Sequence, residues 1–322
     1  MTFRFGRLAS TMYERLELQR FHNLLFKNTD VSLEWFSWYL DRIGQLMDPD
    51  IETRVYTAYD GDKLVGIWCV EPKDFSVNGK KIKVGRCFSV GTHPDYRRQG
   101  LFGDLSKFAI DEERQQGEYE YILGFPQVGK PVVEAHLKVG WEHVQRIEMY
   151  GLKPTRPTMH FSLMGVMGIN GSTFAENGYS YQPWNGTDDA TVSGFLTTSD
   201  YMDIKWLQHP DHHYICLSTH DASYAVIKPY AAVGHILDVG GGHFGVRYLL
   251  DTIKTLAYRH KWEELTIWCA DNEHLGDAIR AAGFTPGAEH GLSIDMLAVK
   301  INATEPLKMD RVHLQMGLEE IY

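Results

Sequence analysis

The stretch "GTHPDYRRQGLFGDLSKFAID", residues 91 to 111, places a proline turn, two arginines and a glycine directly before an amphipathic run. The apolar residues of that run recur at helical spacing: Leu101, Leu105, Phe108 and Ala109. A helix is therefore expected to begin just after Gly100. The start of a helix exposes backbone N–H groups without partners and carries the positive end of the helix dipole. The stretch predicts a site for an anion of the phosphate type.

Length and charge limit the classes of protein that the sequence can encode. A chain of 322 residues with 43% hydrophobic residues is long enough for two ordinary domains. It has no run of about 18 apolar residues, and its first 21 residues lack the apolar core of a signal peptide. We therefore expect a soluble, cytoplasmic protein without a membrane partner. The net charge of −10 disfavours nucleic acid as a general partner but leaves room for a local basic groove.

The four cysteines lie within apolar, strand-like runs and form no C-x-x-C pair. They are Cys69, Cys87, Cys216 and Cys269. This pattern favours buried free thiols over disulfides or a metal site.

The first half of the sequence alternates helical and strand-like patterns. Residues 11–47 predict two helices, and the runs "RVYTAYD", "KLVGIWCVEP" and "KIKVGRCFSVG" predict three strands in a meander. The helix of the opening stretch follows, and then a strand "YEYILGFP", a helix "KPVVEAHLKVGW" and a strand "EHVQRIEMYGL". Because a helix joins these last two strands, they are expected to lie parallel.

The second half partly repeats this order after a connector rich in Gly, Pro, Asn, Ser and Thr. A helix "DATVSGFLTTSDYMDIKWLQHP" is expected first, and three strands, a helix, a strand, a short helix and a terminal strand around "GLSIDMLAVKI" follow it. The sequence therefore predicts an α/β fold with a mixed, mostly antiparallel central sheet and flanking helices, present twice. The expected boundaries are 1–152, a connector 153–187, and 188–322.

The opening stretch resembles the signature Arg/Gln-x-x-Gly-x-Gly/Ala of the GCN5-related N-acetyltransferase (GNAT) superfamily. The matching residues follow a strand that ends at Val90 and a turn with Pro94 and Tyr96. Phe102 stands where the family has a small residue. The resemblance implies the GNAT fold, twice in tandem, and acetyl-CoA or another acyl-CoA as co-substrate, with no metal. The cofactor-binding positions that it implies are Phe88, Ser89, Val90, Arg97, Arg98, Gln99, Gly100, Leu101 and Phe102.

The resemblance also suggests where to look for acid–base groups. Many members carry Tyr-x-Lys-x-Gly-Phe, whose tyrosine protonates the leaving thiolate. Here the frame begins at His136, which becomes a candidate general acid; the alternative is that His136 packs on a helix and the thiolate leaves unprotonated. The weak candidates for a base are Glu71, Asp74, His93 and Glu118. Each is more simply a solvated side chain.

Three further features have structural and functional interpretations. The glycine-rich loop of 238–250 lacks the arginine or glutamine of the signature, and Ile279 stands at the thiolate-acid position. These differences predict a degenerate second domain that shapes the acceptor pocket. The histidines of "QHPDHHY" (His209, His212 and His213) favour a polar turn over a metal site. Trp35 and Trp38 favour a core role over an acceptor platform.

The leading hypothesis is an acyl-CoA-dependent N-acyltransferase that acts on the primary amine of a small polar acceptor, such as an amino sugar or its nucleotide. The wider pattern resembles two-domain members linked with polysaccharide or amino-sugar pathways. One alternative is a catalytically lapsed acyl-CoA-binding protein. Another is an N-acyltransferase for a macromolecular amine, in a modified DNA base or a protein. The oligomeric state stays open.

Overall fold

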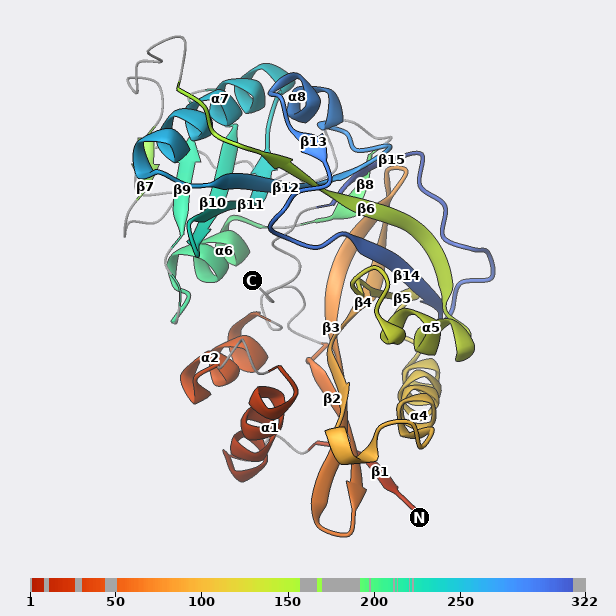
Figure 1. Cartoon of the computed structure of the whole chain (residues 1–322). Coiled ribbons are helices and arrows are strands. Elements are labelled where there is room, and N and C mark those ends of the chain that lie inside the picture. The colour runs from red at the N-terminus through yellow and green to blue at the C-terminus, as the bar shows by residue number, and fades with distance from the viewer. Residues whose placement is uncertain are drawn as a thin grey trace. The chain divides into compact units, whose positions relative to one another are not determined.

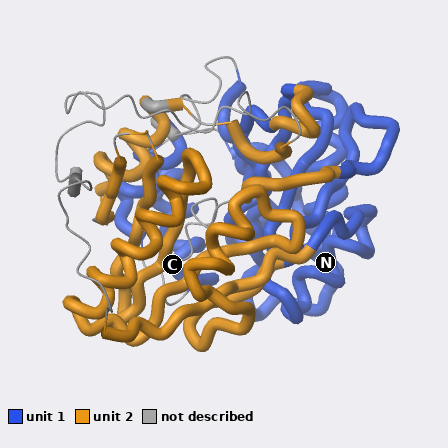
Figure 2. The backbone as a smooth tube through the Cα atoms, turned by 90° about the horizontal axis from the view of Figure 1, so that it is seen from above, with its two compact units in different colours: residues 1–75, 81–145, 295–308 blue, residues 76–80, 146–294, 309–322 orange. Residues whose placement is uncertain are grey.

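The computed structural model describes residues 2–8, 12–26, 31–43, 51–156, 167–169, 192–196, 198–210, 212, 214–219, 221 and 223–314. The chain divides into two compact units (Figure 2). Unit 1 contains residues 1–75, 81–145 and 295–308; unit 2 contains 76–80, 146–294 and 309–322. Each unit is built mostly from one half of the sequence and takes one strand, or part of one, from the other half.

Unit 1 combines two early helices with a twisted sheet. Its elements are β1 (Arg4–Arg7), α1 (Met12–Leu25), α2 (Leu33–Trp38), the π-helical turn η1 (Tyr39–Ile43), β2 (Arg54–Asp60), β3 (Lys63–Val77), β4 (Lys80–Thr92), the 3-10 turn η2 (Pro94–Tyr96), α4 (Leu101–Gln116), β5 (Tyr121–Gly124), α5 (Pro131–Lys138), the first residues of β6 (Glu142–Leu152), and β14 (Ile294–Lys300). Helices α1 and α2 lie on one face of strands β2 and β3, and α4 lies on the other (Figure 1). The expected meander and the helix of the opening stretch are confirmed.

The strand order in unit 1 is β1-β2-β3-β4-β5-β14, with β6 next. Strands β4 and β5 pair in parallel, and β5 pairs antiparallel with β14, from Leu297 opposite Gly124 to Lys300 opposite Tyr121. The expected parallel neighbourhood of β5 and β6 is therefore wrong, because β14 lies between them. Leu297 and Val299 are buried in the core between the sheet and α4.

Unit 2 repeats the pattern with shorter strands. Its elements are the later residues of β6, β7 (Met167–Ile169), β8 (Val192–Phe195), α6 (Ser199–Met202), the π-helical turn η4 (Asp203–Leu207), β9 (Ile215–Ser218), β10 (Tyr224–Tyr230), β11 (Val233–Gly240), α7 (His243–His260), β12 (Glu264–Ala270), α8 (Gly276–Ala281), β13 (Thr285–Pro286) and β15 (Arg311–His313). Strand order is β6-β12-β11-β10-β9-β7, and β11 and β12 pair in parallel. The long helix expected at 189–210 is wrong in its first part, because Val192–Phe195 pair with Arg311–His313 as a strand.

Several expectations about the chain as a whole can be compared with the structure. All four cysteines are buried and free, as predicted. Among the described residues, no helix combines the length and the apolar run needed to cross a bilayer. The connector 153–187 lies largely outside the described residues, and the domain boundaries stay a prediction.

Candidate functional site

The predicted anion site lies at the start of α4 in unit 1. Gly100 is the N-cap residue, with φ +80° and ψ −11°, and offers no side-chain cap. Glycine adopts a positive φ without the strain that a side chain would cause, which explains the glycine at this position. The first backbone hydrogen bond at this end runs from the Asp104 N–H to the Gly100 carbonyl, at 3.1 Å. Within the described residues, the N–H groups of Leu101, Phe102 and Gly103 have no acceptor, so they remain available to a ligand.

Two arginines stand beside these donors on the exposed loop after η2. Arg97 donates from Nε to the Thr92 carbonyl at 3.4 Å, which leaves the end of its guanidinium unused. Arg98 has φ +62° and makes no ion pair or hydrogen bond to the part of the chain that the structure describes. Gln99 bonds back to the carbonyl of Asp95. Helix dipole, free N–H groups and two cations together favour a multiply charged anion.

Strand β4 carries the second part of the site. Its parallel pairing with β5 runs from Val84 opposite Tyr121 to Arg86 opposite Leu123, whereas β4 itself continues to Thr92. The segment from Phe88 to Thr92 is half-buried, in contrast to the buried residues before it. Ser89 has φ +45°, which bends the strand at this point. The backbone of Phe88, Ser89 and Val90 is thus open on the side from which β5 has separated, and an extended ligand can pair with it as a strand would.

His136 lies on α5 in a fully packed setting. Its ring makes edge-on contacts with Phe102 (centroids 5.1 Å apart) and Trp141 (4.7 Å), and the residue is 3% exposed. Nδ1 lies 2.8 Å from the Val132 carbonyl, which can only accept, so Nδ1 carries the proton. Nε2 is buried and has no partner among the described residues. Burial lowers the pKa of His136 to about 4, and the ring is neutral at pH 7.

The four candidate bases are all engaged with other side chains. Glu118 pairs with Arg54 at 2.5 Å, and Asp74 pairs with Lys81 and Lys83, each at 2.7 Å. The Nδ1 of His93 accepts from the N–H of Asp95 and so caps η2. Glu71 is fully buried and accepts from Arg86, Lys73 and Tyr39. These contacts hold the side chains in fixed orientations within the fold, which suits structural roles better than proton abstraction.

The cluster around Glu71 was missed by sequence reasoning. Tyr39, Lys73 and Arg86 belong to no motif, and they come from η1, β3 and β4. A signal was present, because Arg86 interrupts the apolar run "KVGRCFSV" and Lys73 lies within β3, in a run of buried residues. A charged side chain at an inward strand position requires a partner, and that requirement pointed to a polar cluster.

The corresponding place in unit 2 is built differently. The parallel pairing of β11 with β12 ends at Ile236 opposite Ile267. Beyond it, His313 of β15 hydrogen-bonds the backbone of Val239 and the Glu273 carboxylate, the latter at 2.9 Å. The bond to Glu273 raises the pKa of His313 despite burial. The gap between these strand ends is thus filled by a side chain of the protein itself.

The glycine-rich loop of unit 2 serves packing. A Cβ on Gly241 would lie 2.4 Å from the Ser223 hydroxyl, and one on Gly245 would lie 2.1 Å from the same atom. Close approach of the β9–β10 turn therefore accounts for these two glycines. Ile279 is buried in the core of unit 2, as its apolar side chain predicts.

The remaining candidates pack within the fold. The rings of His209 and His212 stack with centroids 4.8 Å apart, and the His212 N–H donates to His209. His213 lies outside the described residues. No group of three metal-binding side chains occurs in the described part of the chain. Trp35 and Trp38 are 6% and 8% exposed, and Trp35 stacks on Tyr39.

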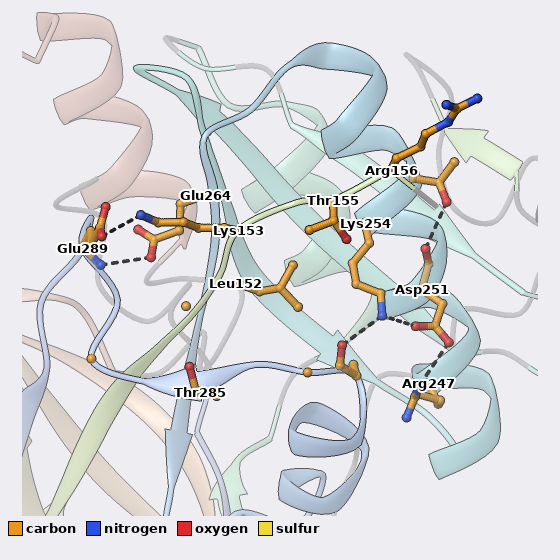
Figure 3. A pocket seen from close by; sticks show the side chains of 15 residues that line it. Leu152, Lys153, Thr155, Arg156, Arg247, Asp251, Lys254, Glu264, Thr285 and Glu289 are labelled. Carbon is orange, nitrogen blue, oxygen red and sulfur yellow. Dashed lines mark hydrogen bonds and ion pairs between the residues drawn. The ribbon is translucent and has the colours of Figure 1, made fainter. Parts of the chain in front are cut away.

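A separate cavity of about 670 Å³ lies in unit 2, beside β6 and α7 (Figure 3). Its charged lining is paired internally: Lys153 bonds Glu289 at 2.7 Å, and Asp251 binds Arg247 and Lys254 at 3.0 and 2.5 Å. The buried Glu264 accepts from two backbone N–H groups of 289–290. The cavity shares no residue with the loop before α4.

Comparison with known proteins gives a consistent result. Residues 17–143 match the family model described as the acetyltransferase (GNAT) domain. No curated protein sequence matches the chain. A GCN5-related N-acetyltransferase from Anabaena variabilis superposes with a TM-score of 0.67 at 11% identity, covering 93% of this chain and 73% of that one.

Two further solved structures share this fold at low identity. One from Kribbella flavida, also a GCN5-related N-acetyltransferase, has a TM-score of 0.60 at 11% identity, with 92% and 71% of the two chains covered. A tandem GNAT protein from the clavulanic acid biosynthesis pathway has a TM-score of 0.57 at 12% identity, with 94% and 100% covered. The mixed α/β fold of this chain is that of GNAT structures.

Proposed function

Because residues 17–143 of this chain match the family model of the acetyltransferase (GNAT) domain, we propose that the chain uses one acyl-CoA, bound in unit 1, to acylate the amine of a small polar acceptor. The observation that carries the proposal is the pairing of two features in unit 1. The open backbone of Phe88 to Val90 suits the amide groups of pantetheine, and the free N–H groups at the start of α4 suit a pyrophosphate.

The residues implied by the resemblance divide into three roles in this proposal. Phe88, Ser89 and Val90 offer backbone groups to pantetheine, and one N–H there polarises the thioester carbonyl as it becomes an oxyanion. Arg97, Arg98 and Gln99 surround the phosphates with side chains. Gly100, Leu101 and Phe102 present backbone N–H groups. Phe102 replaces the usual small residue without blocking these donors, because its ring turns inward against His136.

We propose a structural role for His136 in place of acid catalysis. A neutral ring whose single proton bonds the Val132 carbonyl has no proton at Nε2 to give to a thiolate at pH 7. Its edge-on contacts with Phe102 and Trp141 instead fix the first turn of α4 against α5. The thiolate of CoA then leaves without an acid from this position, and the amine proton passes to water.

Unit 2 is proposed to bind no second acyl-CoA. His313 bonds the backbone of Val239 beyond the last parallel pair of β11 and β12, and Gly241 and Gly245 are accounted for by packing on Ser223. The proposed contribution of unit 2 is to support unit 1, and the proposed tandem boundaries remain 1–152, 153–187 and 188–322. An amino sugar or nucleotide amino sugar is the proposed acceptor, in the cytoplasm. A catalytically lapsed acyl-CoA-binding protein is the alternative.

The test is thiol release from acetyl-CoA with a panel of amines: glucosamine, a nucleotide amino sugar, spermidine and a lysine-containing peptide. Acceptor-dependent release above the rate of hydrolysis supports the proposal, and the best amine names the class of acceptor. Tight binding of acetyl-CoA without release on any amine would favour the non-catalytic alternative. Release only on the peptide would move the acceptor to a macromolecule.

A further inference from the structure

A buried polar cluster joins the helical turn η1 to the strand that carries the proposed acyl-CoA backbone. We call it the Tyr39 cluster: Tyr39, Glu71, Lys73 and Arg86. The Tyr39 hydroxyl donates to Glu71 Oε2 at 3.0 Å and accepts from the Arg86 guanidinium. Glu71 Oε1 accepts from Arg86 Nε at 2.5 Å and from Lys73 Nζ at 3.1 Å. Each of the four residues is 3% exposed or less.

The position of the cluster in the sheet gives it access to the site. Arg86 is the last residue of β4 that pairs with β5. Phe88 lies two residues further, on the same face of the strand and at the start of the open segment. The ring of Tyr39 contacts that of Phe88 with centroids 5.0 Å apart, and the Arg86 guanidinium lies 5.3 Å from the same ring centroid. The cluster therefore packs against Phe88, the first residue of the proposed pantetheine-binding segment.

The chemistry of the cluster fits positioning rather than proton transfer. Glu71 accepts hydrogen bonds from two cations and a phenol, so both of its carboxylate oxygens are engaged within the fold. A buried carboxylate held in this way is poorly placed to take a proton from a substrate. Buried ion pairs also contribute little net stability compared with apolar side chains of the same size, because both charges lose their hydration. The main effect of such ion pairs is to fix the relative positions of the side chains that form them.

We propose that Tyr39 is a positioning residue: its hydroxyl fixes η1 to β4 through Glu71 and Arg86, so that α2 and the open segment of β4 keep one relative position. The inference rests on the proposed function above. The ring of Trp35, in α2, stacks on that of Tyr39, with centroids 5.2 Å apart and an angle of 16° between the ring planes. The restraint on Tyr39 therefore extends to α2. Occupation of the open segment by acetyl-CoA should then order α2 and η1, which lie on the face of the sheet opposite α4 (Figure 1).

Unit 1 contains a matched cluster that provides the control. On the α4 face of the sheet, Arg54 makes a bidentate pair with Glu113, and the Tyr56 hydroxyl donates to Glu113 at 2.8 Å. Tyr56 and Glu113 are as deeply buried as Tyr39 and Glu71. The two clusters share chemistry and burial, but the second lies at the last turn of α4, away from Phe88.

The experiment compares Tyr39→Phe with Tyr56→Phe in the full-length chain. Each variant loses one hydroxyl and keeps the ring. Binding of acetyl-CoA is measured by calorimetry, and hydrogen exchange of the peptide covering 33–41 is measured with and without acetyl-CoA. Where an amine supports thiol release, kcat and KM for that amine are added. Melting temperatures report any general loss of stability.

We expect acetyl-CoA to slow exchange of 33–41 in the wild type and in Tyr56→Phe, and to do so much less in Tyr39→Phe. Acetyl-CoA affinity should fall about tenfold in Tyr39→Phe and stay within about threefold in Tyr56→Phe, as loss of a hydrogen bond to a charged group predicts, and kcat/KM should fall in Tyr39→Phe alone. Equal behaviour of the two variants, with acetyl-CoA bound, would overturn the positioning role. Failure of the wild type to bind acetyl-CoA would instead overturn the proposed function.

Discussion

The substitution Gly100→Asp tests the anion site with a magnitude that follows from the geometry. Gly100 is exposed at the start of a helix of 16 residues, and an added Cβ would meet Asp104 Oδ2 at 3.9 Å and nothing closer. The fold should therefore tolerate a side chain here, apart from about 1 kcal/mol for the left-handed backbone, a conformation that Asn and Asp tolerate best among the larger residues.

The cost to binding is electrostatic. A carboxylate about 5 Å from a phosphate charge repels it by about 3 kcal/mol at an effective dielectric constant of about 20. The same carboxylate competes for the free N–H groups of the first turn. Together these effects should weaken acetyl-CoA binding by about 100-fold or more.

Gly100→Asn is the matched control, because asparagine has the same shape and tolerates the same backbone without the charge. We expect it to bind acetyl-CoA within about tenfold of the wild type, and both variants to melt within a few degrees of it. Calorimetry with acetyl-CoA measures the difference. Equal losses in the two variants would refute the electrostatic reasoning, and wild-type affinity in Gly100→Asp would show that the phosphates bind elsewhere.

Three further predictions concern the supporting structure. Leu297→Ala should destabilise unit 1 by about 2–5 kcal/mol in urea unfolding, since Leu297 is fully buried in its core; a change below 1 kcal/mol would contradict the placement of β14. Glu113→Gln should cost about 1–3 kcal/mol, because the buried guanidinium of Arg54 loses its bidentate partner and keeps only the partly exposed Glu118; a neutral effect would contradict the pairing. The pKa of His136 is about 4 in the folded chain and about 6.5 in the unfolded chain, so the neutral ring contributes fully to stability only above pH 6.5. The free energy of unfolding should therefore fall by about 2 kcal/mol by pH 5. His136→Phe should reduce the pH dependence of the urea midpoint without changing the pH profile of thiol release, and a changed profile would restore the acid role.

The sequence predicted the local parts of the site well, because their signals are local. Gly100 at positive φ, the helix after it and the strand before it are all encoded in the consecutive residues 80–116. The departure of β4 from β5 is a tertiary property that no local pattern encodes. His136 was correctly located on a helix, but its burial depends on Phe102 and Trp141, which approach it from α4 and from the residue before β6.

The exchange of strands could not be predicted from periodicity. The run "IDMLAVK" reads as a buried strand, but nothing in it specifies β5 as its partner, 170 residues earlier. Strands β5 and β12 are both buried and apolar, so either could be the partner of such a strand as far as the sequence shows. The tertiary fold determines that the partner is β5. The Tyr39 cluster could not be predicted for the same reason, because its members come from three separate elements. A fragment of residues 1–152 should consequently lack the strand that completes its core.

The central claim, one acyl-CoA site located in unit 1, is tested most directly by calorimetric titration of the full-length chain with acetyl-CoA, in parallel with Gly100→Asp. The account predicts one molecule bound per chain and loss of that binding in the variant. Two molecules per chain, or one whose affinity is unchanged by Gly100→Asp, would contradict it.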